Sequence, residues 1–97
     1  MHYLIIAHDG TDKGALDRRL AVRPKHLEIA KAMAEAGTLL EGGALLDEEG
    51  RMIGSMAIVD FPHREDLDHW LATDPYVTGG VWQDIQVRPY RRAPLWG

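Results

Sequence analysis

A run near the start of the chain is apolar on both of its faces. Tyr3 to His8 is rich in Ile and Leu and stops at Asp9-Gly10, which predicts a strand that ends in a turn. Because strand side chains alternate, the run divides into two sets: Tyr3, Ile5 and Ala7 on one face, and Leu4, Ile6 and His8 on the other. Both sets are largely apolar, so both faces of the sheet need cover. A chain of 97 residues builds only one modest core, and a second copy of the sheet is the simplest cover for the remaining face.

The other segments complete the order β-α-β-β-α-β. They are a helical region at 15–36, strands at 39–46 and 52–61 around a hairpin turn at 47–50, a helix at 63–73, a strand at 81–90 and a tail at 91–97. This order is typical of a ferredoxin-like α+β fold, in which both helices cover one face of a single antiparallel sheet. No linker or repeat divides the chain, so we expect a single domain over residues 1–97.

Two local features modify this outline. Pro24 interrupts the first helical region and disfavours helical geometry at Arg23, which predicts a short helix, a break, and a main helix that begins at Pro24. His26 would then be the third residue of a helix, where the positive helix end disfavours an imidazolium. Gly42-Gly43 inside the second strand predicts a bulge or a close approach of another backbone.

Composition excludes several classes of function. A net charge of −4 argues against a protein that binds duplex nucleic acid, and the late arginines, Arg88, Arg91 and Arg92, are typical of a solvated tail. The chain has no cysteine, and its five histidines lack metal-ligand spacing, so we expect no metal and no cofactor. No signal peptide and no apolar run of about 20 residues are found, so we expect a cytoplasmic protein without membrane contacts.

Five short motifs, taken in order, resemble the YCII-like (YciI-type) family over nearly the whole chain. They are an arginine-rich stretch ending in R-P-x-H-L at 18–27, a glycine turn at 42–44, Gly54-Ser55 at the start of a strand, W-x-x-x-D-P-Y at 70–76 and V-x-P-[FY] at 87–90. The resemblance implies a dimeric α+β barrel, hence a homodimer, with a pocket in each subunit that bears a histidine and an aspartate. By the matching motifs these are His26 and Asp74.

Those two residues suit acid–base chemistry. Histidine transfers protons best near neutral pH, and a carboxylate beside it fixes the tautomer and stabilises the protonated ring. Asp74 has an alternative role, because aspartate before proline is typical of the N-cap of a new short helix at 75–78; the two roles can coexist. The expected substrate-binding residues are Arg19, Arg23, Ser55 and Tyr76. For both arginines a solvated surface position remains open, and for Tyr76 a core or interface position.

Three functions remain open. The first is an enzyme that uses the His26–Asp74 pair for elimination, isomerisation or dehydrochlorination of a small hydroxylated ring or lactone, as the resemblance implies for some relatives. The second is a dimeric binding module, without turnover, for a small anionic or aromatic metabolite. The third is a purely structural dimerisation domain. A hydrogen-bonded His26–Asp74 pair that opens onto a cavity favours the first, and the third predicts no pocket.

Overall fold

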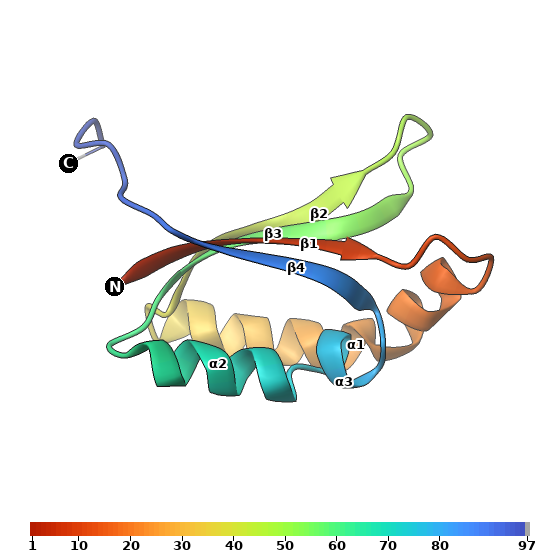
Figure 1. Cartoon of the computed structure of the whole chain (residues 1–97), viewed down its shortest axis with the longest axis horizontal. Helices are drawn as coiled ribbons and strands as arrows, with labels where there is room; N and C mark the ends of the chain where they lie inside the picture. Colours follow the sequence, from red (N-terminus) through yellow and green to blue (C-terminus); the bar gives the residue numbers. More distant parts are fainter. Residues whose placement is uncertain (97) are drawn as a thin grey trace.

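One antiparallel sheet with helices on a single face forms the fold (Figure 1). The computed structural model describes residues 1–96; Gly97, the end of the predicted tail, lies outside them. The strands are β1 (His2–Asp9), β2 (Leu39–Leu46), β3 (Met52–Asp60) and β4 (Trp82–Pro89), and the helices are α1 (Ala15–Glu35), α2 (Arg64–Thr73) and α3 (Pro75–Thr78). The sheet order is β2-β3-β1-β4. The predicted ferredoxin-like α+β fold is confirmed.

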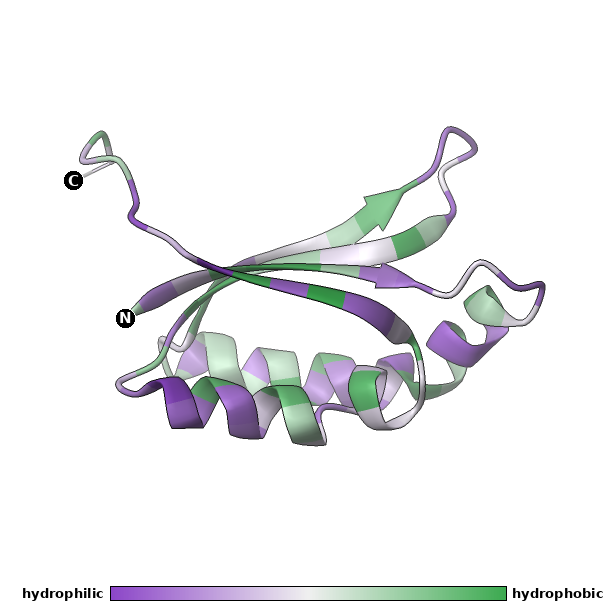
Figure 2. Ribbon diagram, in the orientation of Figure 1, coloured by the Kyte–Doolittle hydropathy of each residue, from purple (hydrophilic) through white to green (hydrophobic). Residues whose placement is uncertain are grey.

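The core lies between the sheet and the helices. Tyr3, Ile5 and Ala7 of β1 are buried there, as the alternation predicts, and Val59 of β3 and Leu67 of α2 pack against them. Figure 2 shows the same alternation of apolar and polar residues along β4. Burial of these side chains is the main force that holds the helices on the sheet.

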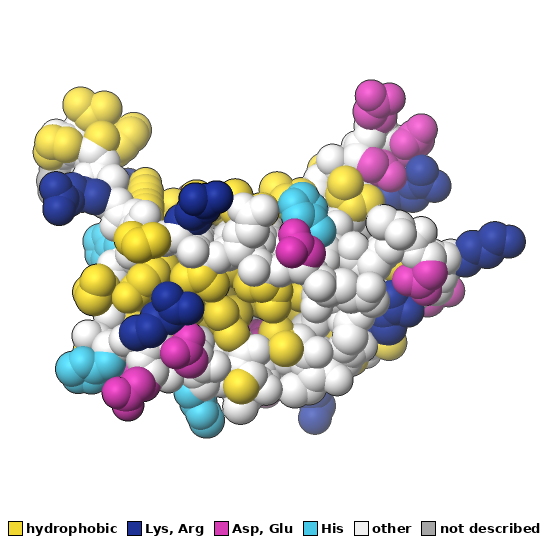
Figure 3. Space-filling model, in the orientation of Figure 1, with side chains coloured by type: hydrophobic (Ala, Val, Ile, Leu, Met, Phe, Trp, Pro, Cys, Tyr) yellow, Lys and Arg dark blue, Asp and Glu magenta, His cyan; other side chains and the backbone are white. Residues whose placement is uncertain are grey.

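Within residues 1–96 no helix covers the opposite sheet face, and this face keeps an apolar strip. The register places Leu4 opposite Ile58 and Ile6 opposite Met56, and all four side chains are half-buried. The C-terminal tail rises above this face, and Figure 3 shows a cluster of hydrophobic and basic side chains on it. A sheet face of this kind is typical of a surface that binds a partner.

The predicted break at Pro24 is wrong. α1 is one helix from Ala15 to Glu35 with Pro24 inside it, and Figure 1 shows the first turns of the helix inclined to the rest. Proline removes one helical hydrogen bond and bends the helix. Packing on both sides of the proline offsets this cost, since Val22 and Met33 both contact the core. His26 therefore lies in the middle of a helix, where the charge of the helix N-terminus does not reach it.

The prediction for Gly42-Gly43 is also wrong. The β2–β3 register is regular at both glycines, and its shifts fall between Leu39 and Glu41 and between Leu45 and Leu46. No other backbone crowds the pair: a Cβ on Gly43 would meet nothing within 4 Å, and a Cβ on Gly42 would make an ordinary contact at 3.5 Å with the Leu39 side chain. The two glycines instead line a cavity beneath the sheet.

Candidate active site

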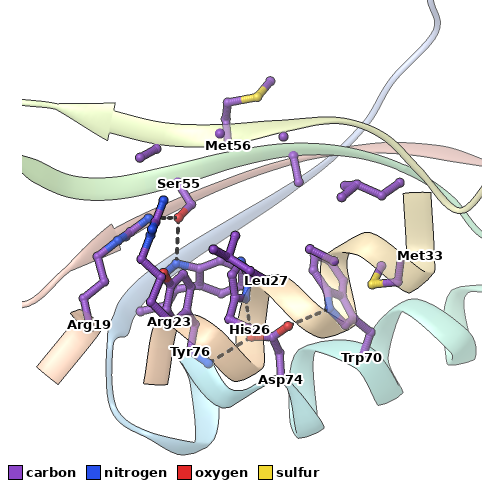
Figure 4. Close-up of a pocket in the computed structure, with 17 residues that line it drawn as sticks. Arg19, Arg23, His26, Leu27, Met33, Ser55, Met56, Trp70, Asp74 and Tyr76 are labelled. Atoms are coloured by element: carbon purple, nitrogen blue, oxygen red, sulfur yellow. Dashed lines mark hydrogen bonds and ion pairs between the residues drawn. The ribbon is translucent and has the colours of Figure 1, made fainter. Parts of the chain in front are cut away.

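A cavity of about 170 Å³ lies between the helices and the sheet (Figure 4). Residues from α1, β2, β3, α2, α3 and β4 line it, and Leu27 and Gly42 are exposed at its rim. All six residues that the sequence predicts for the site line this cavity: His26, Asp74, Arg19, Arg23, Ser55 and Tyr76. Their roles remain predictions, but the fold brings the six together from three separate segments of the chain: α1, β3 and residues 74–76.

His26 and Asp74 are in direct contact. His26 Nδ1 lies 2.8 Å from Asp74 Oδ1, and the His26 side chain is 14% exposed whereas that of Asp74 is 1% exposed. A carboxylate accepts, so the contact assigns a proton to Nδ1. Nε2 has no hydrogen-bond partner among residues 1–96, and the ring lines the cavity. Nε2 is therefore the atom that is available to a ligand.

Asp74 is held rigidly by two further donors. The Tyr76 backbone N–H donates to Oδ1 at 2.9 Å, and the Trp70 indole N–H donates to Oδ2 at 3.1 Å. The first of these is the N-cap bond of α3, which confirms the predicted capping role. Asp74 thus ends α2 through its backbone N–H, while its carboxylate caps α3 and orients the imidazole. A buried carboxylate with three donors has a fixed position, as an orienting group requires.

Aromatic rings confine the imidazole. The Tyr76 ring stacks on His26 with 3.7 Å between centroids and 12° between planes, and Trp82 approaches it edge-on at 5.7 Å. For Tyr76, the core position and the position at the site prove compatible. This residue is buried in the core and also forms part of the cavity wall. The stack restricts rotation of the His26 side chain and keeps its Nδ1 toward Asp74.

Burial raises the pKa of the Tyr76 phenol above its ordinary value of about 10, although the nearby guanidinium groups of Arg19 and Arg23 oppose this rise. We expect the phenol to remain protonated at neutral pH. Because the pKa is higher in the folded than in the unfolded protein, the stabilisation is present below about pH 10 and is lost as the pH rises through the folded value.

The difference between the alkaline absorbance titrations of the wild type and Tyr76→Phe isolates this one phenol. We expect its midpoint to lie above that of free tyrosine. A midpoint at or below the free value would contradict the burial of the phenol.

The two arginines have different environments. Arg19 is 3% exposed, and its Nη1 donates to both carboxylate oxygens of Asp9 at 3.1 Å while its Nη2 donates to Ser55 Oγ at 2.9 Å. The open alternative of a solvated surface position is therefore wrong for Arg19, whose charge Asp9 neutralises. Its guanidinium also lies 4.7 Å from the Tyr76 ring centroid.

Arg23 is half-buried and forms no hydrogen bond or ion pair with residues 1–96 that would neutralise it. Figure 4 shows Arg19 and Arg23 at the same end of the cavity as Ser55. The free positive charge at the cavity thus belongs to Arg23, one turn of α1 after the paired Arg19. An anionic group on a ligand would meet Arg23 rather than Arg19.

The sequence analysis did not single out Asp9, or the site roles of Trp70 and Trp82. Trp82 donates its indole N–H to Ser55 Oγ at 3.1 Å. The Trp70–Asp74 bond could be anticipated from the sequence, because the two residues are four apart and the indole can reach the residue that follows the helix. No local pattern in the sequence points to Asp9 or Trp82, since the two residues come together only when β1 pairs with β4.

Residues 1–96 contain no group of three or more histidine, aspartate or glutamate side chains that is arranged to hold a metal ion. Within the same residues, no helix combines the length and the apolar character that a membrane crossing needs.

The chain is similar to known proteins over most of its length. The model of the YCII-related domain family matches residues 1–91. An uncharacterised protein of Haemophilus influenzae is 37% identical, and protein YciI of Escherichia coli is 33% identical; each alignment covers 95% of this chain and 98% of the relative.

Among solved structures, the same fold occurs in a 5-chloro-2-hydroxyhydroquinone dehydrochlorinase from Burkholderia phenoliruptrix, in complex with 2,5-dihydroxybenzoquinone. The TM-score is 0.83 at 20% identity, and the match covers 96% of both chains.

Proposed function

This chain belongs to the family of YCII-related domains, and we propose that it is an enzyme in which His26 and Asp74 form an acid–base pair. The proposed substrate is a small hydroxylated or chlorinated ring. One observation carries the proposal. His26 Nδ1 is hydrogen-bonded to the buried Asp74 carboxylate, which two further donors hold in place, while Nε2 is left for a ligand in the cavity. This is the base–orienter arrangement of acid–base enzymes.

The size of the cavity supports a single ring. Its volume is about 170 Å³, and a cavity of about 150 Å³ in another protein holds one benzene molecule. Apolar and aromatic side chains, among them Leu27, Trp70 and Trp82, supply much of the wall. Polar groups are concentrated at His26 and at the end near Ser55 and Arg23. An apolar wall with a few convergent polar groups is typical of a site for a small organic molecule.

The dehydrochlorinase with the same fold suggests the reaction. Nε2 of His26 would remove a hydroxyl proton from 5-chloro-2-hydroxyhydroquinone and return it to the ring carbon that bears chlorine. A second hydroxyl proton then passes to Nε2, which is neutral again, and chloride leaves with the carbon–chlorine bonding pair. The net change is the loss of HCl, which gives a hydroxyquinone and needs no oxidant. Asp74 stabilises the imidazolium between the two transfers.

The test is chloride release from 5-chloro-2-hydroxyhydroquinone under anaerobic conditions, with and without the protein. We expect release well above the rate in buffer. If chloride is released only at the buffer rate but 2,5-dihydroxybenzoquinone binds saturably, the protein is the binding module without turnover considered above, and the proposed enzymatic function is contradicted. Absence of both release and binding would contradict the proposed substrate class.

We further propose that a second copy of the chain covers the open sheet face, which carries Leu4, Ile6, Met56 and Ile58 as a half-buried apolar strip. Ile6→Lys places a charge in the middle of this strip, and we expect it to convert a dimer into a monomer in sedimentation equilibrium.

The control for this prediction is Leu20→Lys, which changes an apolar side chain of α1 that is 47% exposed, and we expect it to remain dimeric. A monomeric wild type, or equal dissociation of the two variants, would contradict a dimer through this face.

A further inference from the structure

The hydroxyl group of Ser55 has both of its acceptor positions filled. Arg19 Nη2 donates to Ser55 Oγ at 2.9 Å, and Trp82 Nε1 donates to the same oxygen at 3.1 Å. A serine oxygen offers two lone pairs and one O–H. With both lone pairs in use, the position that remains on the oxygen is its own proton.

The two donors are themselves fixed. Asp9 holds Arg19 through a buried ion pair in which both side chains are 3% exposed. Trp82 belongs to β4 and packs edge-on against Trp70, with 6.1 Å between ring centroids. Rotation of the Ser55 hydroxyl would break one of two well-formed hydrogen bonds, so the direction of the O–H is set by its neighbours.

The O–H has no acceptor among residues 1–96, although Ser55 is 6% exposed and lines the cavity. A buried donor without an acceptor is costly, and a ligand that supplies an acceptor removes this cost. The Arg19 guanidinium polarises the hydroxyl and strengthens it as a donor. Figure 4 shows Ser55 on β3, across the cavity from His26 and Asp74.

We propose that the Ser55 hydroxyl donates a hydrogen bond into the cavity and selects ring ligands that carry an oxygen acceptor, a carbonyl or a phenolate. Arg23 supplies the positive charge at the same end. Ser55 is thus a binding residue that holds the ligand oxygen, and Arg19 and Asp9 are positioning residues that act through it. The inference deepens the proposed function and rests on its single-ring ligand, but not on turnover.

The test compares two single-ring probes by titration calorimetry: 2,5-dihydroxybenzoquinone, which has oxygen acceptors, and toluene, which has none. Ser55→Ala and Ser55→Cys remove the strong donor, whereas Ser55→Thr keeps it. We expect the first two variants to bind the quinone about tenfold or more weakly and to bind toluene as the wild type does. We expect Ser55→Thr to retain quinone binding. Ser55→Cys is nearly isosteric and carries the test if Ser55→Ala does not fold.

Unchanged quinone binding in Ser55→Cys would overturn the inference. An equal loss for both probes would do the same, since it would indicate a packing role. A wild type that does not bind the quinone would also overturn it. Failure of the proposed function alone gives a different result. The wild type then releases no chloride, but it still binds the quinone more tightly than Ser55→Ala and Ser55→Cys do.

Discussion

His26→Ala is expected to lower kcat/KM for chloride release by about 10²- to 10⁴-fold, the usual contribution of a general acid–base residue. The fold should persist, because Asp74 keeps its bonds to the Tyr76 backbone N–H and the Trp70 indole N–H. The measurement is steady-state chloride release, with a thermal melt of the same sample. Added imidazole is expected to restore part of the rate by entering the space that the side chain leaves.

His69→Ala is the matched control for this loss, because His69 is an exposed histidine on α2. It should retain the wild-type rate. A His26→Ala variant with unchanged kcat/KM would reject His26 as the base. A rate that falls only in parallel with unfolding would assign His26 a structural role instead.

Asp9→Ala is expected to have the largest effect on stability. It leaves the buried Arg19 guanidinium without its carboxylate, and the Nε of Arg19 is already buried without a hydrogen-bond partner among residues 1–96. Removal of one partner from a buried ion pair costs about 3–5 kcal/mol, a large part of the free energy of unfolding of a small domain, which is about 5–15 kcal/mol. Urea unfolding at one protein concentration measures the loss.

Two controls accompany this prediction. Asp12→Ala removes an exposed ion pair with Arg18, and we expect little change in the free energy of unfolding. The double variant Asp9→Leu/Arg19→Met replaces both charges with apolar groups and should recover much of the stability that Asp9→Ala loses. If Asp9→Ala unfolds at the same urea midpoint as the wild type, the buried Arg19 charge does not need Asp9 for its stabilisation, and the prediction is contradicted.

The sequence predicted those parts of the structure that depend on local pattern. The alternation in the first strand located the buried face of β1, and the turn at Gly50, whose φ is 81°, followed from its glycine. The Asp74 cap of α3 followed from aspartate before proline. In each of these, a few neighbouring residues decide the backbone conformation and tertiary packing agrees with them.

The predictions that were wrong or missing concern features whose conformation or contacts depend on tertiary packing. Pro24 opposes a continuous helix locally, but core contacts on both sides of it prevail. Arg19 and Arg23 have the same chemistry in the sequence, and only the packing of α1 against the end of β1 reveals that Asp9 neutralises one of them. The motif at 70–76 placed Asp74 near the site, whereas the distance from His26 depends on how the helices sit on the sheet.

The state of the His26 ring is the most direct test of the proposed chemistry. Nitrogen-15 NMR of the wild type, assigned with His26→Gln and recorded at a pH where the imidazole is neutral, separates the two ring nitrogens. The expected result is a proton on Nδ1 and a free lone pair on Nε2, with the Nε2 signal shifted when 2,5-dihydroxybenzoquinone binds. A proton on Nε2, or an Nε2 signal that ignores the bound ligand, would contradict a base that faces the cavity.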